Sequence, residues 1–353
     1  MPEPALLPEP LIPSLALIAC IACVVGAGAL TNCSVLATLV KNYRNGLSSI
    51  ILQLAVADFL ILTTLAGPEL WHYNSRTWQF GDSWCKAYRG LSEFTSTAAS
   101  YLIATIALHA IATFNAKVKI LERRLKRNRE LDEEEEKSSH HSLVASSDTS
   151  TPPRTMKLDY AVNTGIAVTK PSVFIWILAA SLSIPQFVLA TTIDINKSTT
   201  LCTLNSKEPQ HKINMSSMLA AFNLFLPAII TSVAGIVIIC KLKTKKAFYC
   251  VEISEYISNL KFSLYLILLY LTLCCPRSVV SLYHVYSNYF SQSYFYSYKS
   301  EELDNTMTII TLLFTSIYIF ASVIRPVLSL LLLPNHRSLF TRGSHKNVNN
   351  SKI

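Results

Sequence analysis

The sequence predicts an all-α protein, a seven-transmembrane helix bundle with its N-terminus outside and its C-terminus in the cytoplasm. Three observations support this fold class: seven apolar runs, an apolar overall composition, and basic residues grouped beside particular runs. Each run has about 20 residues or more, which is what a helix needs to cross hydrocarbon that offers no partner to a free backbone amide. The predicted spans are 15–40, 49–70, 88–113, 172–190, 216–240, 262–286 and 304–333.

The composition agrees with a protein of the lipid bilayer. Hydrophobic residues make up 51% of the 353 residues, charged residues make up 15%, and the mean hydropathy is +0.35. This is too apolar for one soluble domain. The net charge of +9 does not indicate nucleic-acid binding, because the basic residues lie beside the spans, in 41–44, 123–129 and 241–246. Residues 1–14 contain no Lys or Arg, so the positive-inside rule places the N-terminus outside and these basic segments in the cytoplasm.

The predicted organisation is an extracellular tail, a membrane domain with its loops, and a short cytoplasmic tail. These parts are 1–14, 15–333 and 334–353, with outside loops of about 72–87, 191–215 and 287–303. A cytoplasmic insertion, 115–170, begins with a basic stretch of helical character and continues into a Ser/Thr-rich stretch that is typical of disorder. A functionally silent insertion and a partner-binding segment both fit this composition. No internal repeat is present, which disfavours a secondary transporter.

Three residues outside the membrane are predicted to be modified. Nine cysteines are too few for a disulfide scaffold, and Cys85 and Cys202 are the two that fall in predicted outside segments. Because that side is oxidising, we expect these two cysteines to be bonded to each other. Asn196 begins an Asn-Lys-Ser sequence in an outside loop, which is a glycosylation acceptor.

Several landmarks occur along the spans in a recognisable order. They are Asn32, Leu54-Ala-Val-Ala-Asp58, Trp78-Gln-Phe-Gly81, Cys85, Trp176, Pro227, Pro276 and Pro326. Their order and spacing resemble the rhodopsin-like (class A) family of G-protein-coupled receptors over nearly the whole chain, with a pattern closest to its peptide-binding branch. The resemblance implies a ligand cavity in the outer half of the bundle and a heterotrimeric G protein or arrestin as the cytoplasmic partner.

The switch motifs of that family are altered in this chain. His109-Ala110-Ile111 stands for Asp-Arg-Tyr, Cys274 precedes Pro276 where CWxP has tryptophan, and Arg325-Pro326-Val-Leu-Ser329 stands for NPxxY. Ala110 cannot form the charge-assisted hydrogen bonds that the family arginine makes. The resemblance therefore predicts a retained scaffold with a changed trigger, and it leaves G-protein coupling open.

Arg325 is the replacement with the clearest physical consequence. The resemblance places it near Asp58, where the family has a neutral asparagine beside a sodium and water site. A charge within a bilayer is costly unless it is paired, so we hypothesise that Arg325 pairs with Asp58 as a built-in cation. The alternative is that Arg325 extends to the cytoplasmic edge of the membrane.

The candidate ligand contacts lie on the third and sixth spans. They are Ser92, Glu93, Arg277 and Ser281. Ser92 stands where amine receptors carry an aspartate, which disfavours a biogenic amine. Arg277 suits a carboxylate of a polar or peptide ligand. The alternative is that Glu93 and Arg277 neutralise each other or face the loops.

The function expected from the sequence is a divergent receptor of the plasma membrane for a peptide or other polar ligand. The alternative is a non-signalling seven-helix scaffold or partner subunit that acts through 115–170. A channel is disfavoured by the lack of a polar stripe along a pore. No HExxH or P-loop motif supports an enzyme, and we expect no cofactor and no metal.

Overall fold

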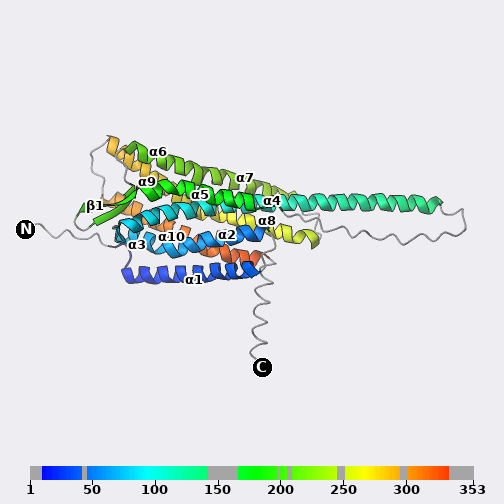
Figure 1. Ribbon diagram of the computed structural model, residues 1–353, viewed down its shortest axis with the longest axis horizontal. Helices are drawn as coiled ribbons and strands as arrows, with labels where there is room; N and C mark the ends of the chain where they lie inside the picture. Colours follow the sequence, from blue (N-terminus) through cyan, green and yellow to red (C-terminus); the bar gives the residue numbers. More distant parts are fainter. Residues whose placement is uncertain are drawn as a thin grey trace, which may run out of the picture.

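The computed structural model describes residues 10–41, 46–141, 166–196, 199–204, 209–244, 251–294 and 301–333. Within this part of the chain, seven helical spans are long and apolar enough to cross a membrane, so the chain is a multi-pass membrane protein. They run side by side along one direction in Figure 1. The predicted number of spans is confirmed, and the helical form of each run pairs most of its backbone groups within the run, as a bilayer requires.

Four of the spans consist of one helix each, and three are divided by a short π-helical turn. The undivided helices are α1 (Ser14–Lys41), α4 (Gly81–His141), α5 (Thr169–Leu189) and α10 (Glu301–Leu332). The divided spans are α2 (Gly46–Leu60), η1 (Ile61–Leu65) and α3 (Ala66–Ser75), then α6 (Pro209–Ala220), η2 (Ala221–Phe225) and α7 (Leu226–Thr244), then α8 (Val251–Leu269), η3 (Tyr270–Cys274) and α9 (Cys275–Tyr294).

Each π turn lies just before a proline. Pro68 follows η1, Pro227 follows η2 and Pro276 follows η3. Proline has no N–H, and its ring collides with the carbonyl four residues earlier, which in each case belongs to the π turn. The wider turn makes room for that ring. It also adds about one residue to the turn, which rotates the following side chains by about 100° relative to a regular helix.

Helix α4 lies at the centre of the bundle and α1 at its periphery. In the most apolar stretch of each span, 72% of the residues are buried for α4 and 11% for α1. The exposed apolar residues of α1 are those that a surrounding lipid phase would cover. Helix α4 also lines part of the cavity described below.

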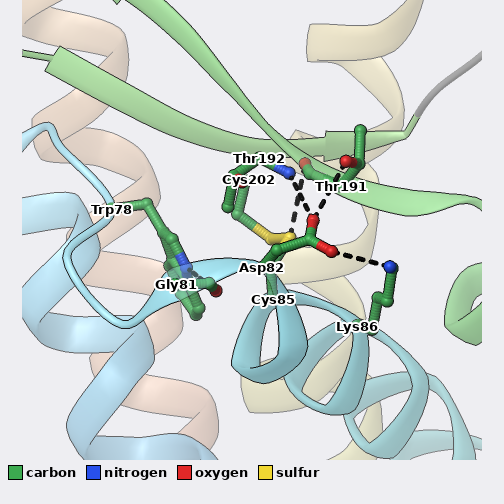
Figure 2. A network of polar contacts seen from close by, with 8 residues as sticks. All are labelled: Trp78, Gly81, Asp82, Cys85, Lys86, Thr191, Thr192 and Cys202. Carbon is green, nitrogen blue, oxygen red and sulfur yellow. Dashed lines mark hydrogen bonds and ion pairs between the residues drawn. A yellow bond between two sulfur atoms is a disulfide. The ribbon is translucent and has the colours of Figure 1, made fainter.

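A two-stranded hairpin covers one end of the bundle, which we call the hairpin end. Strands β1 (Ala190–Asn196) and β2 (Thr199–Leu204) follow α5 and pair antiparallel, with Thr192 opposite Cys202. The disulfide between Cys85 and Cys202 ties β2 to the first turn of α4, with the two Cα atoms 5.6 Å apart (Figure 2). The predicted outside loop over about 191–215 thus contains a hairpin, which its Thr and Ile residues favour, and α6 begins within it at Pro209.

Asp82 is a second attachment point for the hairpin. Its Oδ1 accepts hydrogen bonds from the Thr191 hydroxyl and the Thr192 backbone N–H, each at 3.0 Å, and its Oδ2 lies 2.6 Å from Nζ of Lys86 (Figure 2). Beside it, the indole N–H of Trp78 donates to the Gly81 carbonyl at 2.9 Å. Gly81 has a φ of 80°, which a residue with a side chain rarely adopts.

The other predicted outside loops are shorter than expected. Helix α3 continues to Ser75 and α4 begins at Gly81, so the loop predicted over 72–87 is reduced to its centre. Helix α9 continues to Tyr294 and α10 begins at Glu301. The sequence from 277 to 304 contains no Gly or Pro, so nothing local ends the helix where the apolar run ends.

At the opposite end, α4 continues far beyond the bundle. We call residues 115–141 of α4 the arm; it projects from the other helices in Figure 1. Val118 and Leu121 at its base pack against the second apolar cluster of the core, whereas Leu125 and Leu131 are about half exposed. The basic start of the insertion is thus helical. Its remainder up to 165 and the tail 334–353 lie outside the described residues.

Candidate functional site

A cavity of about 160 Å³ lies between α4, η2 and α9. The four candidate ligand contacts, Ser92, Glu93, Arg277 and Ser281, all line it. Ser92 and Glu93 lie about two turns after Cys85, so the cavity is near the hairpin end. The structure therefore brings all four residues to one place, while assigning two of them other partners than expected.

Arg277 is paired with a carboxylate that the sequence reasoning did not single out. Its Nη2 donates to Oε1 of Glu69 on α3, and its guanidinium lies 4.6 Å from the centre of the Tyr318 ring. The Glu69 side chain is 1% exposed and that of Arg277 is 18% exposed. A buried carboxylate without a cation would be costly, so this pair fixes α9 against α3. The alternative in which Glu93 and Arg277 neutralise each other does not describe this structure, because Arg277 is paired with Glu69.

Glu93 is bound by the π turn η2. Its Oε1 accepts a hydrogen bond from Nδ2 of Asn223. The neighbouring carbonyl of Phe222 accepts a hydrogen bond from the Tyr101 hydroxyl at 2.7 Å. Two residues of α4 thus bind two residues of one π turn, which sets the rotation of that turn towards the cavity.

Three residues that line the cavity carry buried polar atoms without a hydrogen-bond partner among the described residues. These atoms are Nε of Arg89, Oε1 of Gln186 and Oδ1 of Asn223. Most buried polar atoms in proteins are satisfied, so a group of three at one cavity is unusual. None of the three residues was singled out from the sequence.

The second polar site is an ion pair deep in the bundle. Nη1 of Arg325 donates to Oδ1 of Asp58, and Nη2 of Arg325 lies 3.2 Å from Sγ of Cys274. The Arg325 side chain is 2% exposed and that of Asp58 is 1% exposed. Arg325 therefore lies against Asp58, and the alternative of an arginine extended to the membrane edge does not describe this structure.

Pro326 links this ion pair to α1. A proline at 326 cannot donate to the carbonyl of Ser322, four residues earlier. That carbonyl instead accepts a hydrogen bond from Nδ2 of Asn32 at 3.2 Å. One turn further on, the Ser329 hydroxyl donates to the Pro326 carbonyl at 2.8 Å. A cavity of about 10 Å³ adjoins Asp58 and Arg325, which is at the lower limit of the space that admits one water molecule.

The two sites share a short stretch of one span. Cys274, which contacts Arg325, lies three residues before Arg277, which contacts Glu69. Three residues span about 4.5 Å along a helix. Asp58 and Glu69 likewise belong to one span, so two carboxylates of the second span bind cations of the sixth and seventh.

The altered residues of the third-span switch motif are packed in apolar surroundings. Ala110 is 1% exposed and belongs to the apolar cluster that includes Ile238 and Leu260. His109 is buried against the start of α2: a methyl group added to Gly46 would lie 3.0 Å from Cε1 of His109. Ile111 is half-buried beside the same cluster. Ala110 thus presents no charge at this position.

The remaining sequence-predicted features are only partly described. Asn196 ends β1 opposite Thr199, and the rest of its acceptor sequence lies outside the described residues. Among the residues that the structure describes, no group of three or more His, Cys, Asp or Glu side chains could hold a metal ion.

One signal could have found Glu69. It is the second acidic residue of the predicted span 49–70, and the rule that intramembrane charges are paired applies to it as it does to Asp58. Arg89, Gln186 and Asn223 carry no such signal, because polar residues near the ends of spans are common.

Comparison with known proteins gives no relatives: no protein-family model matches the chain, and no curated protein matches its sequence.

Proposed function

We propose that this chain is a divergent receptor of the rhodopsin-like class of G-protein-coupled receptors, in the plasma membrane, with its hairpin end outside. It takes a peptide or other polar ligand in the cavity between α4, η2 and α9. The observation that carries the proposal is this polar cavity at the hairpin end, where Ser92, Glu93, Arg277 and Ser281 meet. Ligand cavities of helix bundles are built in this way, from a few polar groups on facing helices.

The proposed mechanism is a shift between two arrangements of α9. A ligand that contacts Arg277 competes with Glu69 for it, and a ligand that contacts Glu93 competes with Asn223. Weakening of the Glu69–Arg277 pair lets α9 move relative to α3. Because Cys274 lies on the turn before Arg277 and touches Arg325, the same movement alters the deeper ion pair. A ligand shifts such an equilibrium only by its difference in affinity for the two arrangements.

The cytoplasmic contact in this proposal is the arm. Ala110 is buried and apolar and offers no charge to a transducer. The arm carries basic residues between 117 and 129 and projects beyond the bundle, which suits an acidic partner surface.

The receptor function is tested by transducer recruitment in cells. We would measure basal recruitment of G proteins and arrestin to the full chain, to Arg277→Gln and to Lys86→Gln, at matched surface expression. Lys86 is a control because it lies on the same helix as the cavity residues and pairs with Asp82 outside the cavity. We expect Arg277→Gln to change basal recruitment and Lys86→Gln to leave it unchanged. Equal recruitment by all three chains would contradict a link between the cavity and signalling.

The proposed orientation has its own test. Epitopes at the N- and C-termini would be stained in intact cells, and Asn196→Gln would be compared with the parent by gel mobility. We expect surface staining of the N-terminal epitope alone and a loss of glycan in Asn196→Gln. Surface staining of the C-terminal epitope would reverse the proposed orientation.

The arm favours a second candidate function, a non-signalling scaffold. A long charged helix that projects from a membrane domain is suited to hold another protein. Proximity labelling with the full chain and with a chain that lacks 130–155 separates the two functions. Absence of transducer recruitment, together with neighbours that depend on 130–155, would favour the scaffold.

A further inference from the structure

The charged groups that line the cavity are not equivalent. Arg277 is engaged by Glu69, and Glu93 is engaged by Asn223. Arg89 is the cation that remains, because it makes no ion pair among the described residues, and its Nε is buried without a partner. An arginine stays protonated under all ordinary conditions, so this guanidinium is a fixed positive charge that faces the cavity.

Two buried oxygen atoms in the same cavity lack donors. Gln186 is 6% exposed, and its Oε1 has no hydrogen-bond partner in the part of the chain that the structure describes. Asn223 gives its Nδ2 to Glu93, and its Oδ1 finds no donor among the same residues. A buried acceptor without a donor costs free energy, so a ligand gains affinity by supplying N–H groups here.

Glu93 limits the charge of the anion that Arg89 can take. It lies four residues after Arg89, on the same face of α4 and in the lining of the same cavity. A singly charged carboxylate meets less repulsion from Glu93 than a phosphate with nearly two charges does. A phosphate group also offers no N–H donor to Gln186 or Asn223.

We infer, on the basis of the proposed receptor function, that the cavity binds a carboxylate with a neighbouring N–H group, the carboxylate on Arg89 and the N–H on Gln186 or Asn223. Arg277 is not the carboxylate-binding residue, because Glu69 occupies it. The cavity of about 160 Å³ holds a group the size of one amino-acid residue. An N-acylated amino acid and the C-terminal residue of a peptide both present this chemistry.

The inference is tested by thermal stability of the purified full chain. The probes are a set of N-acetyl amino acids and the corresponding N-acetyl amino-acid amides, which keep the side chains and the N–H but lack the carboxylate. We expect a rise in Tm with at least one acid, half-maximal at a concentration at least about tenfold lower than for its amide, since a charge-assisted bond is lost. Equal shifts with acid and amide, or no shift with any acid or free-carboxyl peptide, would overturn the inference.

Substitutions of Arg89 test whether this residue causes the preference for the acid over its amide. Arg89→Gln should abolish the preference for the acid and Arg89→Lys should retain part of it, which also guards against a folding defect in the first variant. Lys86→Gln, which changes a cation one turn earlier on α4, should leave the preference intact. A preference for the acid that persists in Arg89→Gln would reject Arg89 as the binding residue.

Further measurements distinguish an N-acylated amino acid from a peptide C-terminus as the ligand. They also distinguish failure of the proposed ligand chemistry from failure of the proposed receptor function. Short peptides with free or amidated C-termini form a second pair of probes: stabilisation by free-carboxyl peptides at lower concentration than by any N-acetyl amino acid would identify a peptide C-terminus. Because Tm is measured without a transducer, an acid-specific shift without transducer recruitment would retain the ligand chemistry and reject the receptor function. Recruitment that depends on Arg277, without an acid-specific shift in Tm, would retain the receptor function and reject the carboxylate chemistry of the ligand.

Discussion

Asp58 and Arg325 show what a charged pair requires inside an apolar bundle. Each side chain is almost fully buried, and the pair keeps Oδ2 of Asp58 and Nε of Arg325 without partners among the described residues. Such a pair adds little net stability over an apolar pair, yet the loss of one member leaves an uncompensated charge. The two residues therefore depend on each other.

This dependence predicts strong coupling between the two positions. Asp58→Asn and Arg325→Asn should each lower the free energy of unfolding by about 3 to 5 kcal/mol. The double variant should lose less than the sum of the two, because neither charge remains unpaired. Thermal or denaturant unfolding of the purified variants measures the cycle, and purely additive losses would show that the pair is not energetically coupled.

Glu69 and Glu93 form a matched comparison within the cavity. Glu69 balances the charge of Arg277, so Glu69→Gln should destabilise by about 2 kcal/mol. Glu93 accepts a hydrogen bond from the neutral Asn223, so Glu93→Gln keeps an acceptor and should cost about 1 kcal/mol or less. Unfolding measurements that find Glu93→Gln the more damaging change would contradict these partner assignments.

The partners of single residues are only partly readable from the sequence. Asp58 stands out as a charge in the middle of an apolar run, and the family resemblance points to Arg325 as its neighbour. The partner of Arg277 was not predictable in this way. Arg277 follows η3, and the extra residue in that turn rotates it by about 100° relative to a regular helix, which changes the helices that it faces.

Among the elements, the hairpin is held by two attachments of different strength. The Cys85–Cys202 disulfide closes a separation of 117 residues, and Asp82 adds hydrogen bonds to β1 and an exposed ion pair with Lys86. Disulfides typically contribute about 2 to 4 kcal/mol, whereas an exposed ion pair contributes up to about 1 kcal/mol.

The two attachments predict distinct hydrogen-exchange patterns. Cys202→Ser should raise amide exchange along both strands and lower overall stability by about 2 to 4 kcal/mol. Asp82→Asn should raise exchange mainly at Thr191 and Thr192, with a smaller loss of overall stability than Cys202→Ser. Mass-spectrometric exchange over 190–204 distinguishes these results, and protection that is unchanged in Cys202→Ser would show that the disulfide does not hold the hairpin.

The membrane spans were predictable from the sequence, because apolar length decides them. The hairpin was not, because it depends on the pairing of two short strands. The spans come from apolar length alone. The hairpin needs two short strands to find their register over α4, and no turn motif in the sequence marks it. The continuation of α9 to Tyr294 was missed because the end of an apolar run marks the membrane boundary and does not by itself end a helix.

At the scale of the whole molecule, the bundle and the arm are energetically separate. Between Glu122 and Leu131 the side chains of the arm are exposed, apart from that of Arg124, and they include the exposed ion pair of Lys126 and Glu130. Removal of 130–155 should therefore change the free energy of unfolding by no more than about 0.5 kcal/mol. Leu260→Ala, in the apolar cluster at the base of the arm, should cost about 2 to 5 kcal/mol. A large loss of bundle stability on removal of 130–155 would mean that the arm supports the fold.

The continuity of α4 has a consequence for how motion inside the membrane can be observed. The arm has no break between Asn115 and His141, a length of about 39 Å at 1.5 Å per residue. A tilt of α4 by about 10°, small enough to be lost among side-chain rearrangements in the core, would displace its tip by about 7 Å. The distance between two spin labels, one at the tip of the arm and one on α2, would therefore change by several ångströms. The same tilt would move atoms near the buried ion pairs by less than one ångström.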